Sequence, residues 1–279
     1  MQIQFGLGWK KEYYFEVINK NYLDYCLIES YFYQRLKNLG IDSSIIVEMG
    51  NPKYDGIWYK LNNHFEIQGE WNKLKGKKVF CYMTGGHGTS FINRLFGTTR
   101  QALDVYLKFI IQYFRDHKEA GLIFRPHPQL LRKILNNNVW SEADCSEFRS
   151  FFKNSDNMVF DESAFYDEAF LYSDCILTEA DTGICWTSLP TLKPVCMLYA
   201  HSKMSAYEPE LTNHYYNAYN TNDLQSIMET IKNGDDPMYE ERKRAAEIYI
   251  KHFDGKNGWR VREFIKNKVA DKSQNRKWN

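Results

Sequence analysis

Short apolar runs that stop abruptly at polar, proline or glycine residues constrain the fold of this chain more than any other feature. Three of them lie at 121–128 (GLIFRPHP), 174–183 (DCILTEADTG) and 192–198 (LKPVCML). Parallel strands are apolar throughout because both faces of their sheet are buried, and their carboxyl ends deliver side chains to the edge where α/β proteins bind ligands. The pattern therefore predicts a parallel sheet with a ligand site at that edge, and a phosphate-bearing ligand is the leading hypothesis.

Strand-like runs alternate with helix-length segments, which indicates βα units around a parallel sheet rather than a β-sandwich. We expect strands at 2–7, 25–29, 44–49, 78–83, 121–125, 158–160, 175–178 and 194–199. Apolar residues recur three or four positions apart in the expected helices, which include 100–116, 163–171, 221–232, 238–252 and 259–266. The predicted fold class is α/β.

A polar segment at 60–78, rich in Asn and Lys, is typical of a domain boundary. We therefore expect a partial N-terminal α/β domain with its linker at 1–75, a complete nucleotide-binding α/β domain at 76–270 and a polar tail at 271–279. The first part is short for a nucleotide-binding fold and opens directly on an expected strand, so we expect part of that domain to be missing upstream.

Composition excludes several classes of partner. Thirty-six Lys and Arg balance 35 Asp and Glu, so no global field attracts nucleic acid or anionic lipid, and any anion site must be local. Six cysteines without CxxC spacing and histidines without metal-like spacing predict reduced thiols, no bound metal and no cofactor. The absence of a long apolar run or a signal-peptide pattern predicts a cytoplasmic protein, with a basic tail from 266 onward as a possible peripheral contact with the inner face of the cell membrane.

His127 and Arg125 are the first candidates for binding phosphate. Both follow an apolar strand, and His127 lies between two prolines that fix its backbone, so we expect both side chains on one face at the sheet edge. A cation and a titratable donor suit a pyrophosphate leaving group. The alternative is a buried histidine that shapes the turn through a bond to a backbone carbonyl.

The second candidate element is the passage from strand to helix at 178–183. Backbone NH groups near Gly183 and the hydroxyls of Thr178 and Thr182 suit a phosphate, while Glu179 is placed to accept from a ribose or polyol hydroxyl. The alternative is ordinary helix capping by Asp181 or Thr182.

The third candidate is the Gly-rich segment 84–90, which follows the expected strand at 78–83. Thr84, Gly85 and Gly86 would let a ligand approach the backbone closely. His87 is a candidate general base that removes a proton from an acceptor hydroxyl. The alternative is a flexible loop facing the other domain.

A later stretch, 207–219, follows the expected strand at 194–199 and has loop composition with several Tyr and Glu residues. We expect it to line the acceptor side of a cleft, because loops carried by a rigid scaffold often bind ligands.

The chain resembles the CDP-glycerol glycerophosphotransferase family of teichoic-acid and capsule synthesis in the order of five segments: Gly50-Asn-Pro-Lys-Tyr-Asp55, Phe124-Arg-Pro-His-Pro128, Asp174-x-Ile-Leu-Thr-Glu179, Lys193-Pro194, and Asp254-Gly255 with Arg260. The resemblance extends over nearly the whole chain. It implies a GT-B fold, with two Rossmann-like domains facing a cleft, and the use of a CDP-activated polyol to extend a polyol-phosphate polymer.

The chain also departs from the family pattern. Phe5 stands where the family has a catalytic histidine in its N-terminal domain. In the second motif Glu179, Ala180 and Asp181 replace Asp, Tyr and Ser, which leaves Thr182 as the hydroxyl at the family's serine pair. An acidic side chain beside a phosphate is repulsive, so Asp181 predicts that the anion is held differently here or elsewhere.

The resemblance implies attack by a polymer hydroxyl on the β-phosphorus of a CDP-polyol, with CMP leaving and with Arg125, His127, Thr178 and Thr182 stabilising phosphate charge. The expected partners are a nucleotide-activated small molecule and a polymer or lipid-linked acceptor, with no nucleic acid. Two alternatives stay open. One is a GT-B glycosyltransferase that uses a sugar nucleotide, and the other is a non-catalytic or truncated nucleotide-binding homologue that requires a companion subunit.

Overall fold

The structure is a computed structural model, and it describes residues 26–28, 43–63, 69–84, 99–128, 132, 135, 141–179, 183–199 and 213–275. The chain folds as two compact units, one formed by Met1–His64 with Lys243–Asn279 and the other by Phe65–Arg242. This division differs from the expected one, which ran the second domain to residue 270. The boundary at 242 falls inside helix α11 (Tyr239–Tyr249), where the sequence has no Pro- or Gly-containing linker to mark it.

The larger unit is built on a six-stranded sheet, and every pair of neighbouring strands in it is parallel. The strand order is β5-β4-β3-β6-β7-β8. Numbered along the unit, this is the 3-2-1-4-5-6 order of a doubly wound Rossmann fold, in which the winding direction reverses between the first and fourth strands. The reversal therefore lies between β3 and β6. The strands are β3 (Lys78–Met83), β4 (Ala120–Arg125), β5 (Met158–Phe160), β6 (Cys175–Glu179), β7 (Val195–Leu198) and β8 (Tyr216–Ala218).

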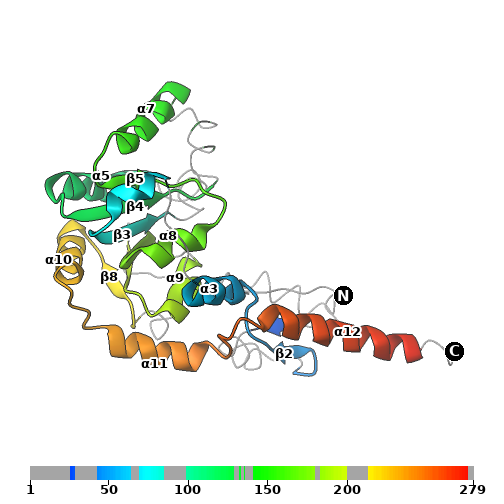
Figure 1. Cartoon of the computed structure of the whole chain (residues 1–279). Coiled ribbons are helices and arrows are strands. Elements are labelled where there is room, and N and C mark those ends of the chain that lie inside the picture. The colour runs from blue at the N-terminus through cyan, green and yellow to red at the C-terminus, as the bar shows by residue number, and fades with distance from the viewer. Residues whose placement is uncertain are drawn as a thin grey trace. The chain divides into compact units, whose positions relative to one another are not determined.

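Helices cover both faces of this sheet. One face packs on α5 (Thr99–Asp116), α7 (Glu142–Lys153) and α10 (Thr221–Lys232) through a core that includes Phe80, Phe124 and Leu177. The alternate strand residues Cys81, Ile123 and Ile176 are buried as well, which is why each strand is apolar throughout. Helix α8 (Tyr166–Tyr172) contacts β3 and β4, and α5 and α8 lie on opposite sides of the sheet (Figure 1). The remaining short helices are α9 (Ile184–Ser188), η1 (Gly69–Leu74) and η2 (Leu189–Thr191).

The sequence predictions did not include α3 (Lys53–Asn62), α7 or β8, nor the short helices η1 and η2. Helix α7 begins at a capping box, in which the Ser141 hydroxyl accepts from the Asp144 backbone NH at 3.2 Å and the Asp144 carboxylate accepts from the Ser141 NH at 2.7 Å. This Ser-x-x-Asp pattern was a usable signal for a helix start. Strand β8 gave little signal because it contains only Tyr, Asn and Ala.

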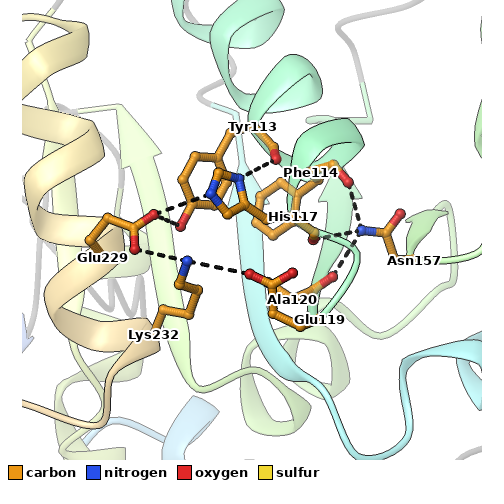
Figure 2. A network of polar contacts seen from close by, with 8 residues as sticks. All are labelled: Tyr113, Phe114, His117, Glu119, Ala120, Asn157, Glu229 and Lys232. Atoms are coloured by element: carbon orange, nitrogen blue, oxygen red, sulfur yellow. Dashed lines mark hydrogen bonds and ion pairs between the residues drawn. The ribbon is translucent and has the colours of Figure 1, made fainter.

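The amino edge of the sheet is closed by side chains that bond to one another and to helix ends (Figure 2). Tyr113 of α5 donates to the Glu229 carboxylate of α10 at 2.6 Å, and Lys232 bridges Glu229 and Glu119 at 2.8 and 3.3 Å. The buried Asn157 amide donates to the carbonyls of Phe114, His117 and Ala120. These bonds join the end of α5 to the starts of β4 and β5.

The smaller unit contains two parallel strands, β1 (Cys26–Ile28) and β2 (Ile46–Glu48), with helices α3 and α12 (Asn257–Asn275). The Asp55 carboxylate accepts from the backbone NH groups of Asn257 and Gly258 at 2.9 and 2.7 Å. An acidic cap at a helix N-terminus satisfies free NH groups and complements the helix dipole. A residue of α3 thus begins a helix some 200 positions later, which explains why the last part of the chain belongs to this unit.

Two of the segments that carry the family resemblance meet at this cap. A Cβ atom on Gly50 would lie 1.9 Å from the Asn257 side-chain oxygen, so only glycine permits this approach. Gly255 has φ +72 and lies against the Trp58 ring. Arg260 forms an ion pair with Asp254 and lowers the pKa of that carboxyl to about 2. Segments 50–55 and 254–260 therefore form one structural junction.

Other expectations concern the thiols and the membrane. Five cysteines of the described part, Cys81, Cys145, Cys175, Cys185 and Cys196, are free and buried, and their reduced state stays a prediction. Among the residues that the structure describes, no helix has the length and apolar character needed to cross a bilayer. The expected strand at 2–7 and Phe5 lie outside the described residues.

Candidate functional site

The carboxyl ends of β4, β3 and β6 lie side by side at the point where the winding of the sheet reverses. Met83 of β3 is paired with Arg125 of β4 on one side and with Thr178 of β6 on the other. Open α/β sheets bind ligands in the crevice outside the strand ends at such a point. The structure therefore brings Thr84, His127 and Glu179, which follow or end these strands, to one sheet edge.

Threonine hydroxyls fasten the three strand ends together. The Thr84 backbone NH donates to the Arg125 carbonyl at 3.3 Å, and its hydroxyl accepts from the His127 NH at 2.8 Å. The Thr178 hydroxyl donates to the Met83 carbonyl at 3.0 Å. Both threonines are buried. A hydroxyl that accepts a hydrogen bond still has its own proton to donate. Thr84 can therefore donate to an anion at this edge, whereas Thr178 donates its proton to a carbonyl within the sheet. The predicted phosphate contact of Thr178 stays a prediction.

His127 is half-buried and follows β4 directly, between Pro126 and the exposed Pro128. Its backbone NH is held by Thr84, and the flanking prolines restrict the backbone on both sides. His127 thus lies in a restrained turn at the strand ends, and the role of its imidazole stays a prediction.

Arg125 makes contacts within the larger unit that the sequence did not predict. Its side chain is buried and forms an ion pair with the buried Asp161 carboxylate. It also donates to the Ser163 hydroxyl at 3.0 Å and to the Ser163 carbonyl at 2.7 Å. The guanidinium therefore holds the turn that follows β5, which makes Arg125 a positioning residue in this geometry. Its direct contact with phosphate stays a prediction.

Asp161, Ser163 and Phe165 were missed as site residues. The Ser163 NH donates to the Asp161 carboxylate at 3.0 Å, which is an Asx-turn immediately after β5. This turn, held by Arg125, carries Phe165, whose side chain is 63% exposed at the carboxyl edge. An Asp-x-Ser pattern directly after an apolar strand was the available signal for the turn.

Glu179 ends β6, on the side of the sheet that carries Tyr82. Burial, and after it the charge of Glu179, raises the pKa of Tyr82 well above its usual value. The carboxylate therefore lies close to the switch point. Gly183 begins α9, which has only five residues, so its helix dipole is small and the predicted anion site on this N-terminus gains little from it.

The other predicted site residues lie outside the described residues: His87, Gly85, Gly86, Asp181 and Thr182. Their roles stay predictions. In the described part, no group of three or more His, Cys, Asp or Glu side chains is placed to hold a metal ion.

The described part of 207–219 does not form the expected cleft-lining loop. Tyr216–Ala218 is the edge strand β8, and His214 and Tyr215 are buried just before it, at the amino edge. Burial, and after it the charge of Arg242, lowers the pKa of His214 to about 4. His214 and Tyr215, two of the residues that suggested a binding loop, are instead buried at the sheet edge opposite the candidate site.

Comparisons with solved structures identify the fold. No family model and no curated protein matches the sequence. The Staphylococcus aureus MnaA structure with UDP superposes with a TM-score of 0.56 at 17% identity, over 88% of this chain and 60% of that one. A Methanocaldococcus jannaschii UDP-GlcNAc 2-epimerase in complex with UDP-GlcNAc and UDP gives 0.57 at 17% identity, over 88% and 61%.

A structure of the wall teichoic acid polymerase TagF gives a TM-score of 0.56 at 13% identity, over 89% of this chain and 59% of that one. The chain thus spans about 60% of the length of these structures. At such identities the similarity concerns the fold alone. The comparisons and the six-stranded parallel sheet together confirm the predicted class: this chain has a mixed α/β, GT-B-like fold.

Proposed function

We propose that this chain is a GT-B transferase of the CDP-glycerol glycerophosphotransferase type, which moves a polyol phosphate from a CDP-polyol to a hydroxyl of a cell-envelope or capsule polymer. The observation that carries the proposal is the assembly of His127, Thr84 and Glu179 around the switch point, fixed by bonds between neighbouring strand ends. This is the position at which doubly wound sheets bind nucleotides.

The proposed step is a displacement at phosphorus. An acceptor hydroxyl oxygen bonds to the β-phosphorus, the bond from that phosphorus to the bridging oxygen breaks, and CMP leaves with the bonding electrons. The acceptor proton passes to a base, for which His87 is the candidate. His127 and the Thr84 hydroxyl stabilise the charge that develops on the leaving phosphate. Glu179 accepts from hydroxyls of the ribose or polyol.

The support for the CDP-polyol donor is the resemblance in segments 124–128 and 174–179, together with the fold shared with a wall teichoic acid polymerase. Neither fixes the donor. The fold is shared equally with structures that contain UDP or UDP-GlcNAc, and this observation favours a second candidate, a glycosyltransferase that uses a sugar nucleotide. A third candidate, a non-catalytic homologue, is favoured by Phe5, which stands where the family has a catalytic histidine.

Calorimetric titration with CDP-glycerol, CDP-ribitol, UDP-glucose and UDP-GlcNAc distinguishes the candidates. We expect the two CDP-polyols to bind more tightly than the UDP-sugars, and His127→Ala to weaken them about tenfold to a hundredfold, because a hydrogen bond to a charged group is lost. His117→Gln is the matched control, since it removes an imidazole from the opposite edge of the same sheet.

A preference for UDP-sugars would replace the first candidate with the second. If the CDP-polyols bind, release of CMP on addition of a polyol-phosphate acceptor tests turnover. Binding without any CMP release would favour the non-catalytic homologue, and equal affinity of the His127 and His117 variants would remove His127 from the proposed site.

A further inference from the structure

The net charge of the chain conceals a strong segregation of charge along the sequence. Residues 243–279 carry eleven Lys and Arg against four Asp and Glu, whereas residues 1–242 carry 25 against 31. The C-terminal segment is therefore strongly basic on an otherwise acidic chain. Helix α12 carries part of this excess, with Arg260, Arg262, Lys266, Lys268 and Lys272 against Glu263 and Asp271.

One stripe of α12 combines exposed cations with exposed apolar side chains. Trp259, Arg262, Lys266 and Val269 are separated by three, four and three positions, which places them on one side of the helix. Trp259 is 56% and Val269 is 59% exposed, and the side chains of Arg262 and Lys266 are 71% and 74% exposed. We call these four residues the α12 stripe.

The acidic neighbour of the stripe does not neutralise it. Glu263 contacts Arg262 at 3.2 Å and Lys266 at 3.8 Å. One carboxylate shared by two cations leaves a net positive charge, and both cations stay mostly exposed. Surface ion pairs of this kind contribute little free energy and are readily exchanged.

The opposite side of α12 fixes the helix to its own unit. Val261 is buried, and the N-terminus of the helix is capped by Asp55 of α3. The stripe is thus the outward side of an anchored helix.

We infer that the α12 stripe docks on the surface of a bilayer that contains anionic lipid. Cations three to four positions apart attract an anionic surface, and an exposed tryptophan with a nearby aliphatic side chain favours the region between headgroups and acyl chains. A soluble polyanion needs only the cations, so Trp259 and Val269 favour the bilayer. The stripe belongs to the smaller unit, and the inference does not depend on which donor is used at the sheet of the larger unit.

Vesicle flotation of the whole chain, without nucleotide, tests the inference. We expect binding to phosphatidylcholine vesicles with about 30% phosphatidylglycerol, little binding to phosphatidylcholine alone, and loss of binding at high salt. The double variant Arg262→Gln/Lys266→Gln should weaken partitioning roughly 25-fold, at about fivefold for each cation. Trp259→Ala should weaken it roughly tenfold, because a buried aromatic surface is lost.

Lys75→Gln/Lys153→Gln is the matched control, since it removes two exposed cations from the larger unit. We expect this control to bind as the unaltered chain does. An equal loss in both double variants, or equal binding to neutral vesicles, would overturn the inference. Binding to soluble polyglycerol phosphate together with an unchanged Trp259→Ala variant on vesicles would also overturn it, in favour of a polyanion. Far-ultraviolet circular dichroism of the α12 variants, which does not depend on the proposed nucleotide site, shows that they are folded.

Discussion

At the amino edge of the large sheet, polar side chains bond to one another and to helix ends, whereas at the carboxyl edge they join the ends of neighbouring strands, next to His127 and Glu179. Asn157, Lys193 and Arg242 illustrate the amino edge, because each donates to backbone carbonyls beside the sheet. Thr84 and His127 illustrate the carboxyl edge. Polar side chains thus bond to backbone carbonyls at one edge, and at the other edge they join the strand ends that carry the proposed site.

The difference follows from the direction of the strands. In a parallel βα array every loop that enters a strand lies at one edge, and every loop that leaves a strand lies at the other. The entering loops can close tightly, and here they are sealed by residues such as the buried Asn157. The leaving loops carry the variable functional segments of such folds. Substitutions at the amino edge should therefore change stability and leave nucleotide affinity intact, while those at the carboxyl edge should change affinity.

Arg125 is the most severe test of this comparison, because it lies at the carboxyl edge but is buried in an ion pair. We expect Arg125→Ala to lower the free energy of unfolding by about 3–5 kcal/mol, since it leaves the Asp161 carboxylate buried without its cation. Urea denaturation measures this loss. Arg125→Met/Asp161→Leu should recover most of it. A variant that stays stable but no longer binds nucleotide would show instead that the guanidinium binds phosphate directly.

Asn157 tests the amino edge. Asn157→Ala should lower the free energy of unfolding by about 3 kcal/mol, because three carbonyls lose a buried donor. The midpoint of urea denaturation reports the change, with the exposed Asn72→Ala as its control. Nucleotide affinity of the folded variant should be unchanged. A large loss of affinity at unaltered stability would break the division between the two edges.

His214, at the amino edge, should make the free energy of unfolding depend on pH. The folded chain binds a proton at His214 with a pKa of about 4, whereas the unfolded chain does so near 6.5. The unfolded state therefore binds more protons between these values, so stability is complete above pH 6.5 and falls as the pH is lowered through this window. We expect this residue to account for about 2 kcal/mol of lost stability at pH 5. His214→Phe should flatten the curve of unfolding free energy against pH, and an unchanged curve would contradict the assignment.

Among these substitutions, a change at Thr84 should have the smallest effect on the free energy of unfolding and the clearest effect on nucleotide affinity. Thr84→Val removes the hydroxyl that accepts from the His127 NH and should cost about 1 kcal/mol of stability. Nucleotide affinity should fall as well, because both the hydroxyl and the position of the imidazole change. Thr84→Ser keeps the hydroxyl and should bind normally. Equal binding by the Val and Ser variants would mean that Thr84 acts only within the sheet.

The strands of the large sheet were predictable because local pattern determines them. The runs 78–83, 121–125 and 158–160 match β3, β4 and β5 within a residue at either end. Buried parallel strands are apolar on both faces, so each one appears in the sequence as a short, continuous apolar run. Strand β8 lacked this signal, and its pairing with β7 depends on neighbours supplied by the rest of the sheet.

The sequence alone determined the α/β class, the positions of the inner strands and the placement of His127 and Glu179 at strand ends, because each depends on residues close together in the chain. The tertiary structure decided the rest. It assigned Arg125 to Asp161 and Ser163, Asp55 to the start of α12, and residues 243–279 to the first unit. These pairings join residues from about 36 to more than 200 positions apart, so no local pattern carries them, and only the packing of the folded chain selects one partner among many.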